Sequence, residues 1–123
     1  MADKKRILIV DDEIEAADYL KEYFEGQGLE VSTAGTGEQA LEVLASFKPS
    51  LVLLDMRMGK GLSGLEVIRR AKASKSSAQF VVVTGVDDQN VAKMAIGLGA
   101  SDYLTKPFRI ADLERIVLAR LKS

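Results

Sequence analysis

Short apolar segments alternate along the chain with longer segments whose apolar residues recur at helical spacing. The apolar segments are RILIV (6–10), LEVSTA (29–34), LVLLD (51–55), FVVVT (80–84) and SDYLT (101–105). The longer segments are 13–26, 37–47, 62–73, 88–97 and 109–121. A strand buried on both faces is apolar along its length, whereas a helix buries one stripe, so the pattern predicts five strands alternating with five helices.

This alternation predicts an α/β fold, a doubly wound parallel sheet covered by helices on both faces. Strands 6–10, 51–55 and 80–84 are the most continuously apolar, so we expect them at the centre of the sheet. The expected strand order is 2-1-3-4-5, a flavodoxin-like (βα)5 arrangement. No linker or repeat interrupts the pattern, and residues 1–123 are expected to form one domain.

Polar residues stand where the strands end. Asp11 and Asp12 follow the first strand and Asp55 ends the third. Thr84 ends the fourth strand and Lys106 follows the fifth. Ligands of open parallel sheets bind at the carboxyl ends of the strands, beside the point where the strand order reverses. We therefore expect these five side chains to meet at one edge of the sheet.

The expected grouping of acids predicts a bound cation. Three carboxylates brought together repel one another, and the single ammonium of Lys106 cannot neutralise them. Mg²⁺ is the best match, because it binds few carboxylates, keeps several waters and accepts a phosphate oxygen. An aspartate beside such an ion can attack phosphorus and form an aspartyl phosphate. Lys106 would add positive charge and Thr84 a hydroxyl donor to that chemistry.

Each of these residues also has a simpler explanation when it is taken alone. Asp12 would cap the first helix, with Glu15 completing an Asp-x-x-Glu capping box. Asp55 and Thr84 would be strand-end turn residues, and Lys106 would merely precede a proline that approaches a helix. None of these explanations predicts that four separate strands deliver the required groups to the same edge, so the combination favours a site.

Two glycine patterns imitate phosphate-binding loops. Gly35–Thr36–Gly37 follows the second strand, which we expect at the edge of the sheet, away from the binding crevice. Gly59–Lys60–Gly61, with Gly64, begins several residues after its strand. Neither has the strand–turn–helix context that dinucleotide binding requires, and no GxxxxGK[ST] motif is present. We therefore do not expect nucleotide binding.

Composition narrows the function further. The chain has no cysteine and no histidine, which excludes disulfides, thiolate metal sites, a Ser-His-Asp triad and a phosphohistidine. The formal net charge is -1, so nothing favours direct binding to nucleic acid or to a membrane surface. No apolar run has membrane-spanning length, and the first residues do not form a signal peptide. We expect a cytoplasmic location.

Four strings resemble the bacterial receiver-domain family of two-component response regulators, and the resemblance covers essentially the whole chain. They are ILIVDDE (7–13), LVLLDMRM (51–58), VVVTG (81–85) and GASDYLTKPF (99–108). The resemblance implies a phosphorelay switch in which Asp55 accepts the phosphoryl group. It implies that Asp11, Asp12 and Asp55, together with the backbone carbonyl of Arg57, are ligands of Mg²⁺.

The resemblance also assigns a phosphate contact to Lys106 and a switching role to Thr84 and Tyr103. Lys106 is expected to contact the phosphate and to have a cis bond to Pro107, a device of tight turns. Thr84 is expected to move toward the phosphoryl group, with Tyr103 following it. The output surface is then the fourth helix, the fifth strand and the fifth helix.

The resemblance implies partners and a limited chemistry. The upstream partner is a sensor histidine kinase or a histidine phosphotransfer protein, and the downstream partner is an effector or output domain. A phosphorylation-dependent homodimer is left open. The chemistry is self-directed phosphoryl transfer and autodephosphorylation, so the chain is not expected to be an enzyme.

The loop after the third strand departs from the family pattern. Met58 is followed by Gly59 where the family has proline, and GKGLSG is one residue long before Gly64. This departure leaves kinase docking and phosphoryl lifetime open, but not the set of site residues.

Functions of two other classes are the alternatives. An aspartyl-phosphate phosphatase typically has a second aspartate two residues after the first, where this chain has Arg57. A flavodoxin-like cofactor binder requires an apolar aromatic platform, whereas the expected edge is acidic.

Overall fold

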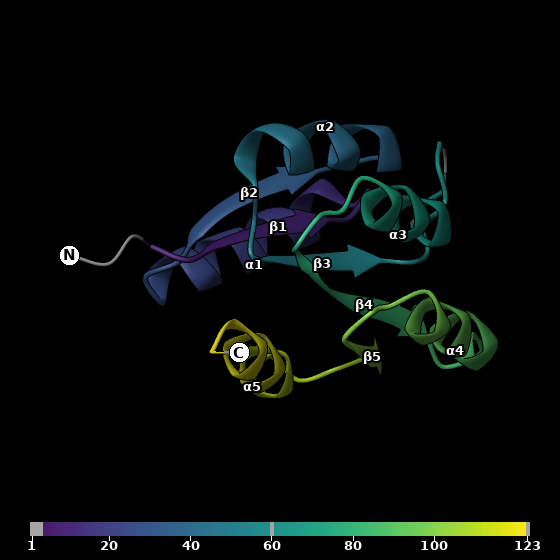
Figure 1. The fold of residues 1–123 in the computed structure, drawn as a ribbon. Helices are drawn as coiled ribbons and strands as arrows, with labels where there is room; N and C mark the ends of the chain where they lie inside the picture. The colour runs from purple at the N-terminus through teal and green to yellow at the C-terminus, as the bar shows by residue number, and fades with distance from the viewer. Residues whose placement is uncertain (1–3, 60, 123) are drawn as a thin grey trace.

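A computed structural model describes residues 4–59 and 61–122, and in this part of the chain five strands alternate with five helices (Figure 1). The strands are β1 (Arg6–Val10), β2 (Glu30–Ala34), β3 (Leu51–Asp55), β4 (Gln79–Gly85) and β5 (Asp102–Lys106). The helices are α1 (Ile14–Gly26), α2 (Gly37–Phe47), α3 (Gly64–Ala73), α4 (Gln89–Gly97) and α5 (Ile110–Leu121). None of the described helices has the length and apolar character needed to cross a membrane.

The strands form one parallel sheet in the order β2-β1-β3-β4-β5, which confirms the predicted topology. The arrows of β2, β3 and β4 point the same way in Figure 1. The strand register brings the carboxyl ends together, since Asp55 of β3 pairs with Val83 of β4, and Gly85 of β4 pairs with Lys106 of β5. The most apolar strands, β1, β3 and β4, occupy the centre of the sheet as predicted.

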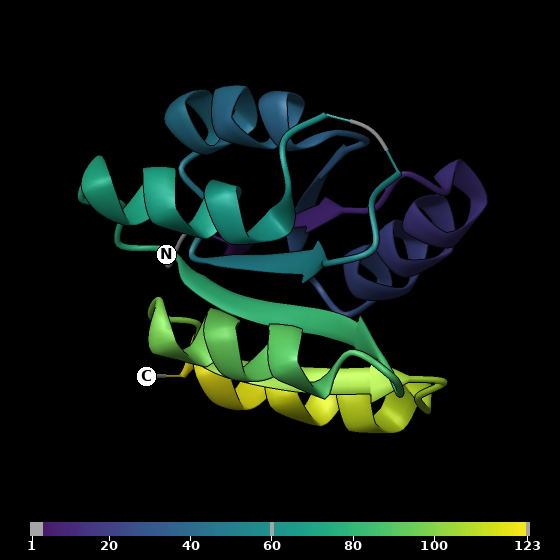
Figure 2. The same ribbon diagram turned by 90° about the vertical axis from the view of Figure 1, so that its right-hand side faces the viewer.

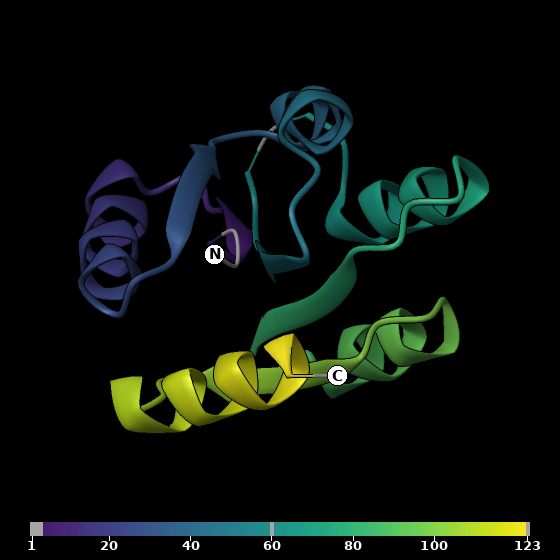
Figure 3. The same cartoon turned by 60° about the vertical axis from the view of Figure 1, so that its left-hand side comes forward.

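The sheet buries a separate apolar core on each face, because side chains alternate along every strand. Odd-numbered residues of β1, β3 and β4 pack with α1 and α5, and even-numbered residues pack with α2, α3 and α4. Figure 2 shows α4 and α5 on opposite sides of β5, and Figure 3 shows α1 and α3 at opposite sides of the molecule. The polar site must therefore lie on the edge between the two cores.

The first glycine pattern serves to begin a helix. Thr36 is the N-cap of α2, and its hydroxyl accepts a hydrogen bond from the backbone N–H of Gln39 at 3.1 Å. A Cβ on Gly37 would lie 2.6 Å from the backbone oxygen of Leu62, so a larger residue would displace the loop before α3. Local helix capping and close packing thus account for these residues. Lys60, in the second pattern, lies outside the described residues.

Candidate functional site

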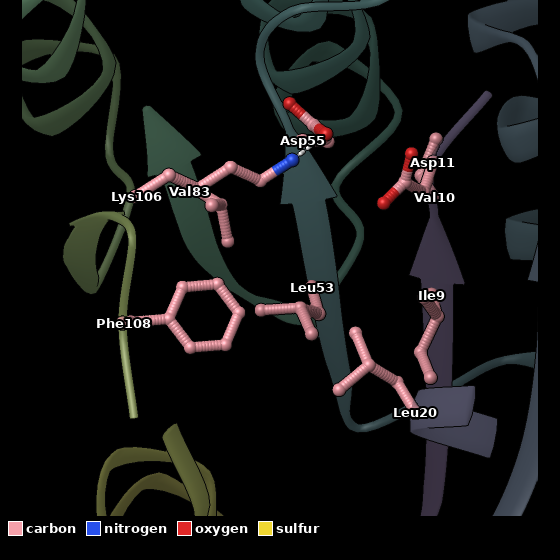
Figure 4. Close-up of a pocket in the computed structure, with 9 residues that line it drawn as sticks. All are labelled: Ile9, Val10, Asp11, Leu20, Leu53, Asp55, Val83, Lys106 and Phe108. Atoms are coloured by element: carbon pink, nitrogen blue, oxygen red, sulfur yellow. Dashed lines mark hydrogen bonds and ion pairs between the residues drawn. The ribbon is translucent and has the colours of Figure 1, made fainter. Parts of the chain in front are cut away.

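Asp55 and Lys106 meet at the carboxyl edge of the sheet. Lys106 Nζ lies 2.7 Å from Asp55 Oδ2, and Figure 4 shows the lysine reaching toward Asp55, with Asp11 on the other side. Burial lowers the pKa of Lys106, but the hydrogen bond and charge of Asp55 outweigh it, so the net pKa shift is upward. The lysine is therefore held in its charged form next to the carboxylate.

Backbone geometry fixes the other oxygen of Asp55. The residue is the last of β3 and only 5% of its surface is exposed. The backbone N–H of Arg57 donates a hydrogen bond to Asp55 Oδ1 at 2.9 Å. Each carboxylate oxygen therefore has one partner of positive character, and the side chain points toward the edge where a ligand would approach.

Asp11 faces Asp55 and Lys106 across a small cavity of about 20 Å³. Figure 4 shows apolar side chains beneath the polar edge, including Leu20, Leu53 and Phe108. Burial raises the pKa of the Asp11 carboxyl above its ordinary value, and the negative charge of Asp55 adds to the rise. The hydrogen bond from Glu13 N–H opposes that rise without cancelling it. A carboxylate in such a position favours a nearby cation.

Asp12 is exposed and binds the long loop that follows β3. Its Oδ2 accepts a hydrogen bond from the backbone N–H of Gly59 at 3.0 Å. The capping-box alternative for Asp12 is wrong, because the N-cap of α1 is Glu13, which makes no side-chain cap hydrogen bond. The chain reaches α1 one residue later than a cap at Asp12 requires, and the carboxylate turns to the loop instead.

The acids of the edge do not close around a common point. Within residues 4–59 and 61–122, no group of three or more acidic, histidine or cysteine side chains is arranged to hold a metal ion by itself. Any ion at this edge would therefore use one or two carboxylates together with backbone oxygens and waters. Mg²⁺ is commonly bound in this way, since it dehydrates reluctantly.

Thr84 carries a buried hydroxyl that has no hydrogen-bond partner in the described structure. Only 1% of the residue is exposed, and Oγ1 is one of two buried unpaired side-chain atoms among the described residues. Thr84 pairs in the sheet with Thr105, next to Lys106. A buried hydroxyl without a hydrogen bond costs about 1–3 kcal/mol of stability. The Thr84 hydroxyl is therefore available to bind a group that enters the site.

The side chain of Arg57 leads away from Asp55 to the start of α4. Arg57 Nε lies 2.7 Å from Asp88 Oδ2, and the hydrogen bond and charge of Asp88 raise the pKa of the guanidinium. The guanidinium lies over Gly85, where a Cβ would come within 3.2 Å of it. Sequence reasoning missed Asp88, because nothing in the pattern of the chain joins it to Arg57.

Tyr103 lies on the outer strand β5, with 41% of its surface exposed. It borders a shallow groove with Ala92, Lys93 and Ile96 of α4. Met94 and Ile96 of α4 are also exposed apolar residues. Tyr103 is not a member of either apolar core, so a purely structural role as core cover does not account for its position. The bond between Lys106 and Pro107 is cis.

Helix α1 carries two exposed apolar residues, one of which borders the site. Ile14 is 74% exposed and Tyr19 is 59% exposed. Tyr19 lines an open pocket of about 300 Å³ that also contains Asp11, Lys106 and Phe108. A molecule bound there would reach the carboxyl edge directly.

Comparison with protein families identifies the chain's relatives. The family model described as the response regulator receiver domain matches residues 7–118. The DNA-binding response regulator MtrA of Mycobacterium tuberculosis is 35% identical over 97% of this chain and 51% of its own length. The alkaline phosphatase synthesis transcriptional regulatory protein PhoP of Bacillus subtilis is 36% identical over 96% of this chain and 49% of its own length. The chain thus spans about half the length of these relatives.

Solved structures of the same kind share the fold. The receiver domain of NtrX from Brucella abortus superposes with a TM-score of 0.88 at 30% identity, covering 95% of this chain and 98% of that domain. The signal receiver domain of a LuxO repressor protein from Vibrio parahaemolyticus gives a TM-score of 0.90 at 26% identity, covering 97% of this chain and 91% of that domain.

Proposed function

This chain belongs to the response regulator receiver domain family of two-component systems, and on that premise we propose that it is a Mg²⁺-dependent switch phosphorylated on Asp55. One observation carries the assignment. Asp55 is a buried carboxylate whose two oxygens are held by Lys106 Nζ and by the backbone N–H of Arg57. The two contacts orient the acid and place positive charge where a transferred phosphoryl group would sit.

The transfer forms one bond and breaks one. An oxygen of Asp55 attacks the phosphorus, the bond between phosphorus and the donor atom breaks, and the donor leaves with its electron pair. A histidine phosphate donor then takes a proton from solvent on its ring nitrogen. Lys106 stays protonated throughout and moves its charge from the carboxylate toward the phosphoryl oxygens. The buried hydroxyl of Thr84 supplies a further donor once the phosphoryl group is present.

The donor set fits Mg²⁺. Asp11, Asp12 and Asp55, with the backbone carbonyl of Arg57, are the proposed ligands, and all four supply oxygen, which this hard cation prefers. Because the three acids do not close around a common point, one or two of them would bind the ion directly and the rest through water. Burial raises the pKa of Asp11, and this supports the proposal because a bound cation would stabilise its charged form. The bound ion would neutralise charge on the phosphoryl oxygens.

The phosphoryl donor is a sensor histidine kinase or a histidine phosphotransfer protein. Exposed Tyr19 supports a protein donor, because it lines the pocket that also contains Asp11 and Lys106. These 123 residues contain no histidine, so a phosphohistidine donor would lie outside them.

The output is read on the face formed by α4, β5 and α5. Exposed Met94, Ile96 and Tyr103 on this face support docking of a downstream effector or output domain. MtrA is named a DNA-binding response regulator and PhoP a transcriptional regulatory protein, so a transcriptional effector is part of the proposal. A phosphorylation-dependent homodimer is a further prediction, and direct nucleic-acid binding by this domain is not proposed.

The chemistry is self-directed rather than that of an enzyme acting on external substrates. Arg57 occupies the position where an aspartyl-phosphate phosphatase has its second acid. The edge of the sheet is acidic, which does not suit a flavin. Autodephosphorylation and a cytoplasmic location are also proposed, the latter because a chain without cysteine suits a reducing compartment.

Intact-mass analysis after incubation with acetyl phosphate and Mg²⁺ tests the assignment of Asp55. The wild-type protein should gain one phosphoryl group, and Asp55→Asn should gain none. Asp18→Asn, a change of the same type at an exposed acid of α1, should leave the uptake unchanged. Uptake by Asp55→Asn at the wild-type rate would refute the proposal.

A further inference from the structure

Asp88 occupies the N-cap position of α4, but its side chain does not cap the helix. It is the N-cap residue of that helix, and aspartate is among the preferred N-cap residues. Its side chain makes no cap hydrogen bond and instead accepts from Arg57 Nε at 2.7 Å. Helices α2 and α3, by contrast, are capped by the side chains of Thr36 and Ser63. The carboxylate of Asp88 is therefore diverted from one available partner to another.

The backbone conformation of Asp88 also differs from that of the two capping residues. Thr36 and Ser63 have extended backbones, with ψ of 164° and 158°, whereas Asp88 has φ -111° and ψ 37°. A capping side chain needs the extended geometry, because only then does its oxygen face the backbone N–H groups of the first turn. Asp88 would have to rotate its backbone in order to cap. Such a rotation would shift the start of α4 relative to the end of β4.

Arg57 connects Asp88 to the phosphorylation site. Its backbone N–H donates to Asp55 Oδ1 at 2.9 Å, while its guanidinium lies over Gly85 and pairs with Asp88. One residue thus contacts both the acceptor carboxylate and the beginning of α4. The charge of Asp55 reaches the guanidinium of Arg57, with a smaller effect than the charges of Asp88 and Asp87.

The ion pair is weak enough to exchange. The Arg57 side chain is 63% exposed and that of Asp88 is 27% exposed, so water screens much of their attraction. A phosphoryl group on Asp55 would carry a charge of about -1.5 to -2 and three acceptor oxygens. Arginine forms strong charge-assisted hydrogen bonds to such groups. The guanidinium would gain a better partner, and the released carboxylate would find donors at the start of α4.

We propose that Asp88 is a positioning residue that exchanges partners when Asp55 is phosphorylated. In the unmodified protein it pairs with Arg57 and leaves α4 uncapped. In the phosphorylated protein Arg57 turns to the phosphoryl group, and Asp88 rotates and caps α4. The inference rests on the proposed function, since it requires a phosphoryl group on Asp55. It provides a path from Asp55 to α4 through surface charges, separate from the path through the buried Thr84.

Amide hydrogen exchange at Asn90 and Val91, the second and third residues of α4, reports the cap. Addition of beryllofluoride with Mg²⁺ to the wild-type protein should slow exchange there about fivefold, which corresponds to about 1 kcal/mol for an N-cap. Arg57→Gln frees Asp88 and should slow exchange by a similar factor without beryllofluoride. Asp88→Ala has no capping oxygen, so beryllofluoride should not slow exchange in that variant.

Two aspartate substitutions separate the cap from a general charge effect. Asp88→Asn keeps a capping oxygen but loses the charge that holds Arg57, so its exchange should already be slow in the unmodified protein. Asp87→Asn is the matched control, with the same loss of charge at the neighbouring exposed position, and should behave as wild type. Equal effects of the two substitutions would overturn the proposal.

The remaining outcomes distinguish this inference from the proposed function. If beryllofluoride shifts the amides beside Asp55 but leaves exchange at Asn90 and Val91 unchanged, the partner exchange is refuted and the phosphorylation site stands. If beryllofluoride perturbs no amide beside Asp55, the proposed function fails. The Arg57→Gln result, which needs no phosphoryl mimic, would then still decide whether Asp88 can cap α4.

Discussion

Lys106 Nζ and Asp55 Oδ2 lie 2.7 Å apart although 51 residues separate them along the chain. Their contact joins the ends of β3 and β5 across β4. The Asp55 side chain is 7% exposed and the Lys106 side chain is 38% exposed, so the carboxylate is buried while water reaches the ammonium. The strength of this pair should therefore lie between that of a surface pair and that of a fully buried pair.

Removal of the ammonium should destabilise the metal-free protein. Lys106→Met leaves the buried carboxylate of Asp55 without its cation, and we expect a loss of about 1–2 kcal/mol in the free energy of unfolding. Urea unfolding in a chelator measures the loss. In the Asp55→Asn background the same substitution should cost little, and additive effects would contradict the pairing. Lys93→Met, at an exposed lysine of α4, is the control.

Asp11 should make the metal-free protein less stable as the pH rises. Its pKa in the unfolded chain is near 3.8, and burial raises its pKa in the folded protein. Between the two values the folded state holds more protons than the unfolded state, so the free energy of unfolding falls as pH increases through this window. Asp11→Asn should remove this decrease in the free energy of unfolding. At pH values above the window, the variant should be more stable than the wild-type protein. Urea unfolding across the acidic range tests this, and an Asp11→Asn curve parallel to that of wild type would contradict it.

Mg²⁺ should stabilise the wild-type protein against thermal unfolding. At about a hundred times the dissociation constant, binding to the folded state alone adds roughly 2.7 kcal/mol. Asp12→Ala should abolish most of that gain, whereas Asp18→Ala on α1 should retain it. Thermal melts with and without Mg²⁺ provide the measurement. Equal shifts in wild type and Asp12→Ala would show that Asp12 is not a ligand.

The hydroxyl of Thr84 should transmit the signal to the output face. Beryllofluoride should shift the NMR signals of amides in residues 88–105 of the wild-type protein as well as those beside Asp55. In Thr84→Ala the distant shifts should shrink while the mimic still binds, because the buried hydroxyl that would move is gone. Thr84→Ser keeps the hydroxyl and should retain them. Distant shifts that persist in Thr84→Ala would show that the coupling follows another route.

The sheet and its polar edge could be predicted because both depend on patterns within single strands. Apolar runs identify buried strands, and the residue at the end of each run is brought to the edge by the parallel arrangement. Asp55 and Lys106 were identified in this way, and the structure places them in contact. The central position of β1, β3 and β4 could be predicted from their apolar runs, since central strands are covered on both faces.

The contacts made by loops could not be predicted, because they depend on how separate connections approach one another. Asp12 was weighed as a helix cap, but the loop after β3 passes close enough for the Gly59 N–H to bind it. Glu38 of α2 similarly accepts a hydrogen bond from Leu62 N–H at 3.1 Å. No periodicity in the sequence encodes these distances. The pairing of Arg57 with Asp88 is of the same kind.

The alternation of odd and even positions between two cores restricts where this chain can change length. One residue inserted within β3 would exchange the side chains that face α1 and α5 with those that face α2, α3 and α4, and would move Asp55 off the edge. One residue inserted after Asp55 changes neither. The extra residue before Gly64 lies in such a tolerant position. This chain should therefore tolerate a single-residue insertion in this loop but not within β3.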